Sequence, residues 1–428
     1  MRLSISCLFA SFACAVLADA VGRVSTRGVT PQKREVPAGY VTTSGAGFEL
    51  DGEPFYFVGT NAFWLPLLIT EDDVDATFQT MAGAGIKVAR TWAFNAINAT
   101  QLPDVLSTNL TYYQVWNNSD WTLNEGPQGL QRLDYVVSAA EKYGIRLILT
   151  FGYGGMELYI YHILGNHATH DEFYTNPTII ASYQSYAQSI VERYKSSSAV
   201  FAWELMNEAR CAGDSLPSGP NCVPGSETLT TWYQLQSDFV RSLDPYHMIT
   251  TGGEGQFYWA VPDTYWYNGT LVSDFNFNGE AGEDFEASLS LPNIDFGTYH
   301  LYPQTWYPEL DYPGSNFSVE DWGLGWIEAH ANTAAYVGKP LLIEEFGVTG
   351  LDNKSSIYPV WYNSPSGIQP WQFGELNLTE DGGNRLIQYT DQIYQGASPN
   401  DGFTFYINQT SVWDIFTAAA AVQSYRSG

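Results

Sequence analysis

The amino-acid sequence predicts an α/β fold, a single (β/α)8 TIM barrel with enlarged βα loops. Short apolar or β-branched runs alternate along the chain with segments of helical pattern, and eight such runs can be counted. About 390 residues remain once the N-terminal segment is set aside, a length that suits one barrel enlarged by loop insertions. A doubly wound parallel sheet is the alternative arrangement of the same elements.

The first half of the chain contains four of the strand-like runs. Residues 55–58 are an apolar run, 73–84 have a helical pattern, and 87–92 form the next strand, which makes a β-α-β opening. The alternation then continues through a helix at 131–143, a strand at 146–151, a helix at 177–194 and a strand at 200–205.

The second half supplies the other four strands. In chain order we expect a helix at 229–243, strands at 248–251 and 294–301, a helix at 319–337, and strands at 340–346 and 368–373. Neither a Pro/Ser-rich linker nor an internal repeat divides the chain, so we expect one domain without an appended binding module.

Composition excludes several classes of partner. The chain has 18 Lys and Arg against 46 Asp and Glu, and its formal net charge is −28. A charge of this sign repels phosphate backbones and anionic lipid surfaces, so we expect neither nucleic-acid nor membrane binding. Aromatic residues make up 15% of the chain, as do charged residues, a balance unlike that of disordered acidic tails. High net charge also favours a soluble monomer.

The N-terminus predicts a secreted, extracellular protein. Residues 1–20 join a basic start to a short apolar stretch and small residues, as in a cleaved signal peptide. A membrane anchor is the alternative, although the stretch falls short of the ~20 residues needed to span a bilayer. Residues 21–34 end in Lys33-Arg34, which predicts a propeptide cut at this dibasic pair and a catalytic domain over 35–428.

Two of the four cysteines lie in the signal segment, which leaves Cys211 and Cys222 as an even pair in an oxidising compartment. We expect them to form a disulfide. Asn-X-Ser/Thr sequons that fit a secreted glycoprotein begin at Asn98, Asn109, Asn117, Asn268, Asn316, Asn353, Asn377 and Asn408.

Polar residues that end the apolar runs are the candidates for chemistry, because a barrel of this kind carries its active site at the C-terminal ends of its strands. Glu208 follows the fourth strand and Glu345 ends the seventh. Cleavage of a glycosidic bond needs such a pair, one carboxyl group to protonate the leaving oxygen and one carboxylate to attack or stabilise the sugar cation. The alternative is that both are solvated loop acids.

The sequence motifs around Glu208 and Glu345 favour the interpretation as a catalytic pair. Residues 203–211, Trp-Glu-Leu-Met-Asn-Glu-Ala-Arg-Cys, closely resemble the acid/base motif of glycoside hydrolase family 5, particularly of its fungal endo-β-1,4-mannanases. Four further segments resemble that family in the same order: residues 88–94, 296–306, 344–347 and 370–374. Residues 150–156 depart from the pattern, because a stretch before the Tyr-Gly-Gly turn is shortened, and this puts the preferred sugar in doubt.

The resemblance implies a role for each catalytic candidate. Glu208 would be the acid/base and Glu345 the nucleophile, and Asn207 would contact the 2-hydroxyl of the sugar. Arg90 and Tyr302 would hold Glu345 ionised and aligned, since a cation and a phenol beside a carboxylate both favour its charged form.

The same resemblance implies several substrate-binding residues. His300 would line the subsite, Trp371 would lie under the sugar, Arg210 would reach the leaving-group side, and Glu254 is a further contact candidate. The remaining tryptophans that stand at or just beyond strand ends, and could therefore line a cleft, are Trp92 and Trp306; Trp203 is expected to pack in the core.

The pair Glu344-Glu345 offers two choices of nucleophile. Successive side chains of a strand point to opposite faces, so we expect only one to face the barrel mouth. In the family the nucleophile directly precedes the aromatic-Gly pair, which selects Glu345. The two carboxyl groups should then stand about 5–5.5 Å apart, the spacing of a retaining mechanism.

The predicted function is hydrolysis of internal β-1,4-mannosidic bonds in mannan, galactomannan and glucomannan. The substrate would be a polysaccharide or oligosaccharide, and we expect no cofactor and no functional metal. Alternatives are an exo-acting β-mannosidase or mannobiohydrolase, a β-1,4-glucanase of the same family, and a carbohydrate-binding pseudoenzyme without turnover.

Overall fold

The structure is a computed structural model that describes residues 35–153, 157–165, 168–212, 216–307, 309–310, 312, 314–315, 318–362, 367–379 and 396–427. The predicted signal peptide (1–20) and propeptide (21–34) lie outside the described residues, as do Asn316 and residues 154–156.

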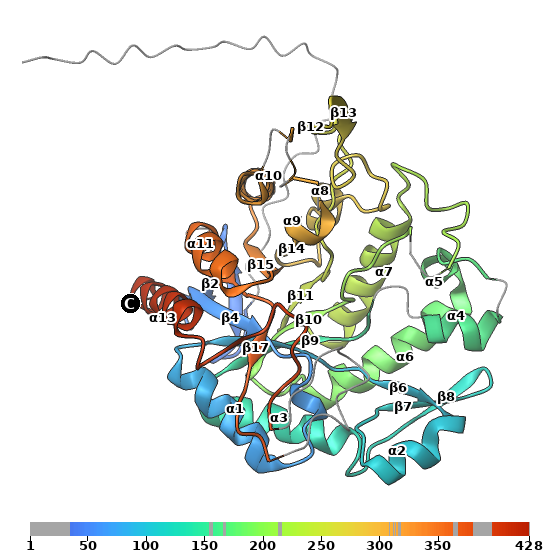
Figure 1. Cartoon of the computed structure of the whole chain (residues 1–428). Coiled ribbons are helices and arrows are strands. Elements are labelled where there is room, and N and C mark those ends of the chain that lie inside the picture. Colours follow the sequence, from blue (N-terminus) through green and yellow to red (C-terminus); the bar gives the residue numbers. More distant parts are fainter. Residues whose placement is uncertain are drawn as a thin grey trace, which may run out of the picture. The chain divides into compact units, whose positions relative to one another are not determined.

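An eight-stranded parallel sheet forms the centre of the described fold (Figure 1). Within this sheet, hydrogen-bonded strands follow one another in the order β11-β10-β9-β5-β4-β16-β15-β14. The strands are β4 (Phe57–Asn61), β5 (Val88–Trp92), β9 (Arg146–Thr150), β10 (Val200–Glu204), β11 (Met248–Thr250), β14 (Gly297–Leu301), β15 (Leu341–Phe346) and β16 (Gly367–Ile368).

The two edge strands of this sheet also meet. The backbone N–H of Asp295, before β14, donates to the carbonyl of Ile249 in β11 at 2.8 Å. The Thr250 hydroxyl donates to the carbonyl of Phe296 at 3.1 Å. These contacts bring the sheet to a nearly closed barrel, and the predicted (β/α)8 fold class is confirmed.

A helix follows each strand and covers its outer side, as expected for a parallel sheet whose strands are buried on both faces. In the described part of the chain these helices are α1 (Glu71–Gly83), α3 (Leu130–Tyr143), α6 (Pro177–Tyr194), α7 (Thr228–Leu243), α8 (Phe285–Leu289), α10 (Val319–Val337), α11 (Leu351–Trp361) and α13 (Thr410–Arg426).

Local sequence fixes the helix ends. The Asn176 side chain accepts the N–H of Thr178 at 3.0 Å, and Pro177 at the first helical position needs no such acceptor, so α6 begins there. Gly144 adopts the left-handed conformation, with φ of 68°, and ends α3.

Short helices and additional strands lie in the connections between the barrel elements, and we did not predict them from the sequence. The short helices are α2 (Leu102–Thr108), α4 (Glu157–Leu164), α5 (Glu172–Thr175) and α9 (Pro303–Trp306). The additional strands are β1 (Val41–Ser44), β2 (Gly47–Leu50), β3 (Glu53–Pro54), β6 (Ala96–Asn98), β7 (Gln114–Asn117), β8 (Asp120–Leu123), β12 (Thr264–Tyr267), β13 (Thr270–Ser273), β17 (Phe373–Gly374) and β18 (Phe405–Tyr406).

The last barrel strand is shorter than the predicted span 368–373. After the two residues of β16 the chain leaves the barrel, and β17 pairs with β18 instead. This departure carries the residues after Ile368 to the mouth of the barrel.

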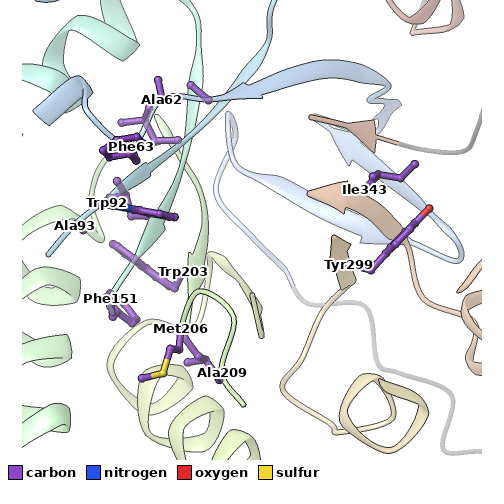
Figure 2. Close-up of a cluster of buried hydrophobic side chains, with 14 of the residues drawn as sticks. Ala62, Phe63, Trp92, Ala93, Phe151, Trp203, Met206, Ala209, Tyr299 and Ile343 are labelled. Atoms are coloured by element: carbon purple, nitrogen blue, oxygen red, sulfur yellow. The ribbon is translucent and has the colours of Figure 1, made fainter. Parts of the chain in front are cut away.

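Two of the three apolar clusters in the described residues line the barrel wall, one on its outer and one on its inner side; the third is a small cluster around Ile97. The larger lies between the strands and the outer helices, and Figure 2 shows part of it, including Phe151 and Trp203, whose rings stack with centroids 5.7 Å apart. The smaller core fills the barrel interior near the strand starts, with Phe48 of β2 at its base. Among the helices described, none combines the length and apolar character needed to cross a bilayer.

Candidate active site

Glu208 lies in the segment that follows β10. Backbone N–H groups of Asn207 and Glu208 donate to the carbonyls of Gly152 at 2.9 Å and Gly252 at 2.8 Å, so this segment is held between the ends of the two neighbouring strands. The backbone of Glu208 has φ of +48°, a left-handed conformation that is uncommon for a residue other than glycine. Its side chain is 23% exposed and reaches the barrel mouth.

Glu345 lies near the end of β15, across the mouth from Glu208. The phenol of Tyr302 donates to its Oε2 at 2.7 Å, and the guanidinium of Arg90 donates to its Oε1. These contacts are the ones expected for a carboxylate held in a fixed orientation.

The two carboxyl groups face one another across a short gap. A ring nitrogen of His300 and one carboxyl oxygen each of Glu208 and Glu345 all lie within 4.8 Å of one another. His300 Nδ1 forms a hydrogen bond of 2.8 Å with Glu208 Oε1 and lies 3.5 Å from Glu345 Oε2. The imidazole therefore links the two acids.

The charge on His300 governs both acids. Burial alone would lower the pKa of His300, but Glu345, Glu208 and Glu344 together raise it well above its ordinary value. Burial would raise the pKa of Glu208, but the hydrogen bond and charge of His300 outweigh burial and lower it. Burial raises the pKa of Glu345, against the charges of His300 and Arg90. These opposite shifts favour the shared proton on His300 over Glu208 while no sugar is bound.

Arg90 is fully buried beneath the cleft and binds protein groups on every side. Its Nε and Nη2 donate to the two carboxyl oxygens of Glu204 at 2.6 and 2.7 Å. Nη2 also donates to Asn207 Oδ1 at 2.6 Å, and Nη1 to Asn61 Oδ1 at 3.0 Å. Arg90 thus positions Glu345 and Asn207 from below and does not line the cleft.

A β-bulge places both members of the Glu344-Glu345 pair beside His300. Tyr299 pairs with Ile343, but the next residue, His300, pairs with Glu345, so Glu344 is an extra residue in its strand. Glu344 Oε2 lies 3.6 Å from His300 Nε2. Strict alternation is therefore an incomplete guide here: Glu345 lines the cleft, whereas Glu344 is fully buried but reaches the same imidazole.

A cleft of 580 Å³ opens above the acid pair. Trp371 forms part of its wall, and its Nε1 donates to Asp401 Oδ2 at 2.6 Å while its ring stacks on Phe63 with centroids 5.6 Å apart. The lining residues are Phe63, Trp92, Phe94, Tyr153, Asn207, Glu208, Arg210, Glu254, Tyr302, Thr305, Trp306, Glu345, Trp371, Asp401 and Phe403.

Arg210 and Glu254 form an ion pair at one side of this cleft, with Arg210 Nη2 2.5 Å from Glu254 Oε1. The next residue along the chain, Cys211, is joined to Cys222 in a disulfide, as the sequence predicted. The Tyr174 phenol donates to the carbonyl of Arg210 at 2.9 Å. The backbone that carries Arg210 is therefore anchored from two sides.

The structure brings the sequence-predicted residues together in one place. Nine of them line the cleft: Trp92, Asn207, Glu208, Arg210, Glu254, Tyr302, Trp306, Glu345 and Trp371. His300 was expected to line the subsite as well, but its side chain is fully buried behind Glu208, like that of Arg90. Trp203 packs in the core, as expected.

Sequence reasoning missed Phe63, Phe94, Tyr153, Thr305, Asp401 and Phe403. Phe63 and Tyr153 stand just beyond the ends of β4 and β9, so the strand-end rule applied to every strand could have found them. Asp401 and Phe403 lie in a long segment after β16 in which no local pattern marks a functional residue.

The acid pair and His300 are also the three-residue group of potential metal ligands among the described residues. The oxygens of Glu345 already accept from Arg90 and Tyr302, and Glu208 Oε1 shares its hydrogen bond with His300 Nδ1. Three further histidines follow the third barrel strand in the sequence, His162, His167 and His170, and their spacing matches no firm zinc pattern. In the structure, His162 contacts the carbonyl of Asn118 at 2.6 Å and His170 that of Cys211 at 3.0 Å, while His167 lies outside the described residues.

Comparisons with known proteins agree with this geometry. The family model described as cellulase (glycosyl hydrolase family 5) matches residues 48–366. The chain is 36% identical to a probable mannan endo-1,4-beta-mannosidase A of Aspergillus flavus, over 95% of each chain. It is 36% identical to mannan endo-1,4-beta-mannosidase A of Aspergillus aculeatus, over 93% of this chain and 94% of the relative.

A solved structure, that of the endo-1,4-beta-mannanase from Rhizomucor miehei, is similar with a TM-score of 0.72 and 30% identity, over 90% of this chain and 99% of that one. The match of the family model to most of the chain, the similar relatives and the arrangement of the acid pair at the barrel mouth lead to one conclusion. The chain belongs to glycosyl hydrolase family 5.

Proposed function

We propose that the protein hydrolyses internal β-1,4-mannosidic bonds by a retaining mechanism, with Glu345 as nucleophile and Glu208 as acid/base. The observation that carries this proposal is the short gap between the two acids, whose nearest oxygens lie within 4.8 Å. Retaining glycosidases keep their carboxyl groups about 5–5.5 Å apart, whereas inverting enzymes leave about 6.5–9.5 Å for a water molecule. The spacing supports the retaining reaction.

In the first step, a Glu345 oxygen attacks the anomeric carbon while the proton shared by His300 and Glu208 passes through Glu208 to the leaving oxygen, and the glycosidic bond breaks. Tyr302 and Arg90 hold the attacking carboxylate by hydrogen bonds. Asn207, fixed by Arg90, lies in the cleft where it can meet the 2-hydroxyl of the sugar. The product of this step is a glycosyl ester of Glu345.

In the second step, Glu208 removes a proton from water, the hydroxyl oxygen bonds to the anomeric carbon, and the ester bond to Glu345 breaks. Glu208 regains the proton that it gave away, so the pair is ready for another turnover. Two displacements on one carbon return the original β configuration.

The names of the similar relatives support mannan as substrate and cleavage within the chain. The test compares galactomannan with carboxymethyl-cellulose, and faster release of reducing ends from cellulose would replace mannanase by β-1,4-glucanase. Mannohexaose separates the modes of action: a spread of oligomers supports endo cleavage, and mannobiose alone would indicate a mannobiohydrolase. Binding to mannan without product would indicate a carbohydrate-binding pseudoenzyme.

Secretion is part of the proposal, with residues 1–20 as signal peptide, 21–34 as propeptide and 35–428 as the mature monomer. The mature chain would then act outside the cell, where plant mannan is found. Intact mass of the enzymatically deglycosylated protein from culture medium should match a chain that starts at Glu35, and a retained N-terminus would contradict this processing. The mass in solution should be that of one chain.

A further inference from the structure

Lys354 is a buried cation behind the cleft. It lies in α11, the helix that follows the strand of Glu345, and it is only 2% exposed. Its ammonium donates to three consecutive carbonyls, those of Gly402 at 3.1 Å, Phe403 at 2.7 Å and Thr404 at 2.9 Å. An ammonium has three N–H donors, and all three have an acceptor here. Burying a charge is costly unless strong hydrogen bonds compensate it, so this arrangement needs an explanation.

The segment that Lys354 holds, residues 401–404, is a bend rather than a helix or strand. Within it, Asp401 Oδ1 accepts the backbone N–H groups of Phe403 at 3.0 Å and Thr404 at 3.3 Å. Lys354 supplies the donors that a helix or sheet would otherwise provide for the carbonyls. Burial lowers the pKa of Lys354 to about 8, against the charge of Asp401, so the ammonium is charged in acidic and neutral solution. We call residues 401–404 the anchored segment.

Asp401 connects the anchored segment to the wall of the cleft. Its Oδ2 accepts from Trp371 Nε1 at 2.6 Å and from Gln372 Nε2 at 2.9 Å. Asp401 and Trp371 both line the cleft. The position of the anchored segment therefore fixes the orientation of this indole.

Phe403 connects the same segment to the partner of the nucleophile candidate. Its ring meets the ring of Tyr302 edge-on, with centroids 5.3 Å apart, and the Tyr302 phenol donates to Glu345. Gly347, just beyond the end of β15, leaves room for this contact, because a Cβ atom at that position would lie 2.7 Å from Phe403 Cδ1. The anchored segment thus reaches both the cleft wall and the group that orients Glu345.

We propose that Lys354 is a positioning residue for the sugar-binding wall of the cleft. Through the three carbonyls it holds Asp401 against Trp371 and Phe403 against Tyr302, although Lys354 itself does not line the cleft. Without the ammonium the anchored segment loses its fixed position, and the wall no longer holds the sugar in one orientation over Glu345. The inference rests on the proposed cleavage of mannan in this cleft.

Lys339 offers a matched control. It follows α10, and its ammonium also donates to three carbonyls, those of Leu289 at 2.7 Å, Leu291 at 2.6 Å and Ile294 at 2.6 Å. Burial lowers its pKa to about 8 as well. These carbonyls precede β14, at the end of the barrel away from the cleft. The two lysines therefore share their chemistry and differ in what they hold.

The test compares Lys354→Met with Lys339→Met. Each variant removes one ammonium and leaves three carbonyls without that donor, so both should lower the melting temperature. At a temperature well below both transitions, kcat/KM on mannohexaose per folded molecule should fall about tenfold or more in Lys354→Met and stay within about twofold in Lys339→Met. Equal values in the two variants, whether kept or lost, would overturn the proposal. If the methionine variants do not fold, Lys354→Gln and Lys339→Gln, which keep an amide donor, supply the same comparison.

Hydrogen exchange gives a second readout that needs no turnover. In the folded Lys354 variant the amides of Phe403 and Thr404 should exchange faster than in the wild type, and in the Lys339 variant they should not. Unchanged exchange would overturn the proposal, as would faster exchange with unchanged kcat/KM, because the wall would then not depend on the anchored segment. If the wild type cleaves no mannan, the proposed function fails, while exchange and the affinity for mannohexaose still report on Lys354.

Discussion

The two ends of the barrel interior differ in what fills them. At the strand starts, Phe48 packs against Phe57, Phe201 and Phe296 with ring centroids 5.3–5.8 Å apart, within a cluster of buried apolar side chains. At the strand ends the same interior holds Arg90 and several carboxyl groups, with Glu344 lacking a hydrogen-bond partner. The apolar end stabilises the fold, and the charged end gives up stability for a site that can move protons.

The largest effect on the rate is expected from substitutions of the two acids at the charged end of the barrel. Glu208→Gln and Glu345→Gln should each lower the rate on mannan by about 10³-fold without lowering the melting temperature. An aryl β-mannobioside with a very acidic phenol as leaving group needs no protonation, so its cleavage step should survive in Glu208→Gln and be lost in Glu345→Gln. Exposed Glu286→Gln is the matched control. Equal loss on both substrates in Glu208→Gln would remove Glu208 from the acid role.

The opposite end should show the opposite response. Phe48→Ala should lower the free energy of unfolding by about 3–5 kcal/mol, because it opens a cavity among three rings. Turnover per folded molecule should stay within about twofold, since the ring lies at the far end of the strands from the cleft. Urea unfolding and active-site-normalised kinetics measure the two quantities. A large fall in kcat with little change in stability would contradict the division between the ends.

The Cys211–Cys222 disulfide sharpens the comparison, because it is a stability device at the catalytic end. Replacing both cysteines by serine should lower the free energy of unfolding by about 2–3 kcal/mol, through the added freedom of the unfolded chain. The effect on kcat/KM should be small, since Tyr174 still holds the carbonyl of Arg210. Loss of activity larger than the loss of stability would mean that the bridge positions Arg210.

The smallest expected effect concerns the wall of the cleft. Asp401→Asn keeps the Oδ1 that accepts from the backbone N–H of Phe403 and replaces the Oδ2 that accepts from Trp371 Nε1 and Gln372 Nε2. It should lower kcat/KM about tenfold through a looser Trp371, with little change in melting temperature. Asp414→Asn, on the exposed side of α13, is the control. An unchanged kcat/KM would show that stacking on Phe63 is sufficient to orient the indole.

Much of the fold follows from the sequence, because barrel strands buried on both faces appear as continuous apolar runs and the covering helices as regular patterns between them. The last strand was harder to predict. Only two residues of β16 pair in the barrel, and Phe373, inside the predicted span, pairs with β18 instead. Short strands such as β12 depend on tertiary packing and leave no comparable pattern.

Site residues that stand at the ends of predicted strands could be identified from the sequence. Glu208 and Glu345 follow apolar runs, and each has a short motif around it. The bulge that brings Glu344 to His300 could not be predicted, because it arises from the pairing of β14 with β15 rather than from either strand alone. Asp401 and Phe403 reach the cleft from a segment with no regular pattern, so only the folded chain places them.

Trapping the covalent intermediate tests the acid pair most directly. Incubation with an activated 2-deoxy-2-fluoro β-mannobioside should add one glycosyl group per chain, and peptide fragmentation should place the added mass on Glu345 rather than on Glu344. The label should fade when mannobiose is added as an acceptor. An adduct on Glu344 or Glu208, or an α-configured product released without any adduct, would contradict the account.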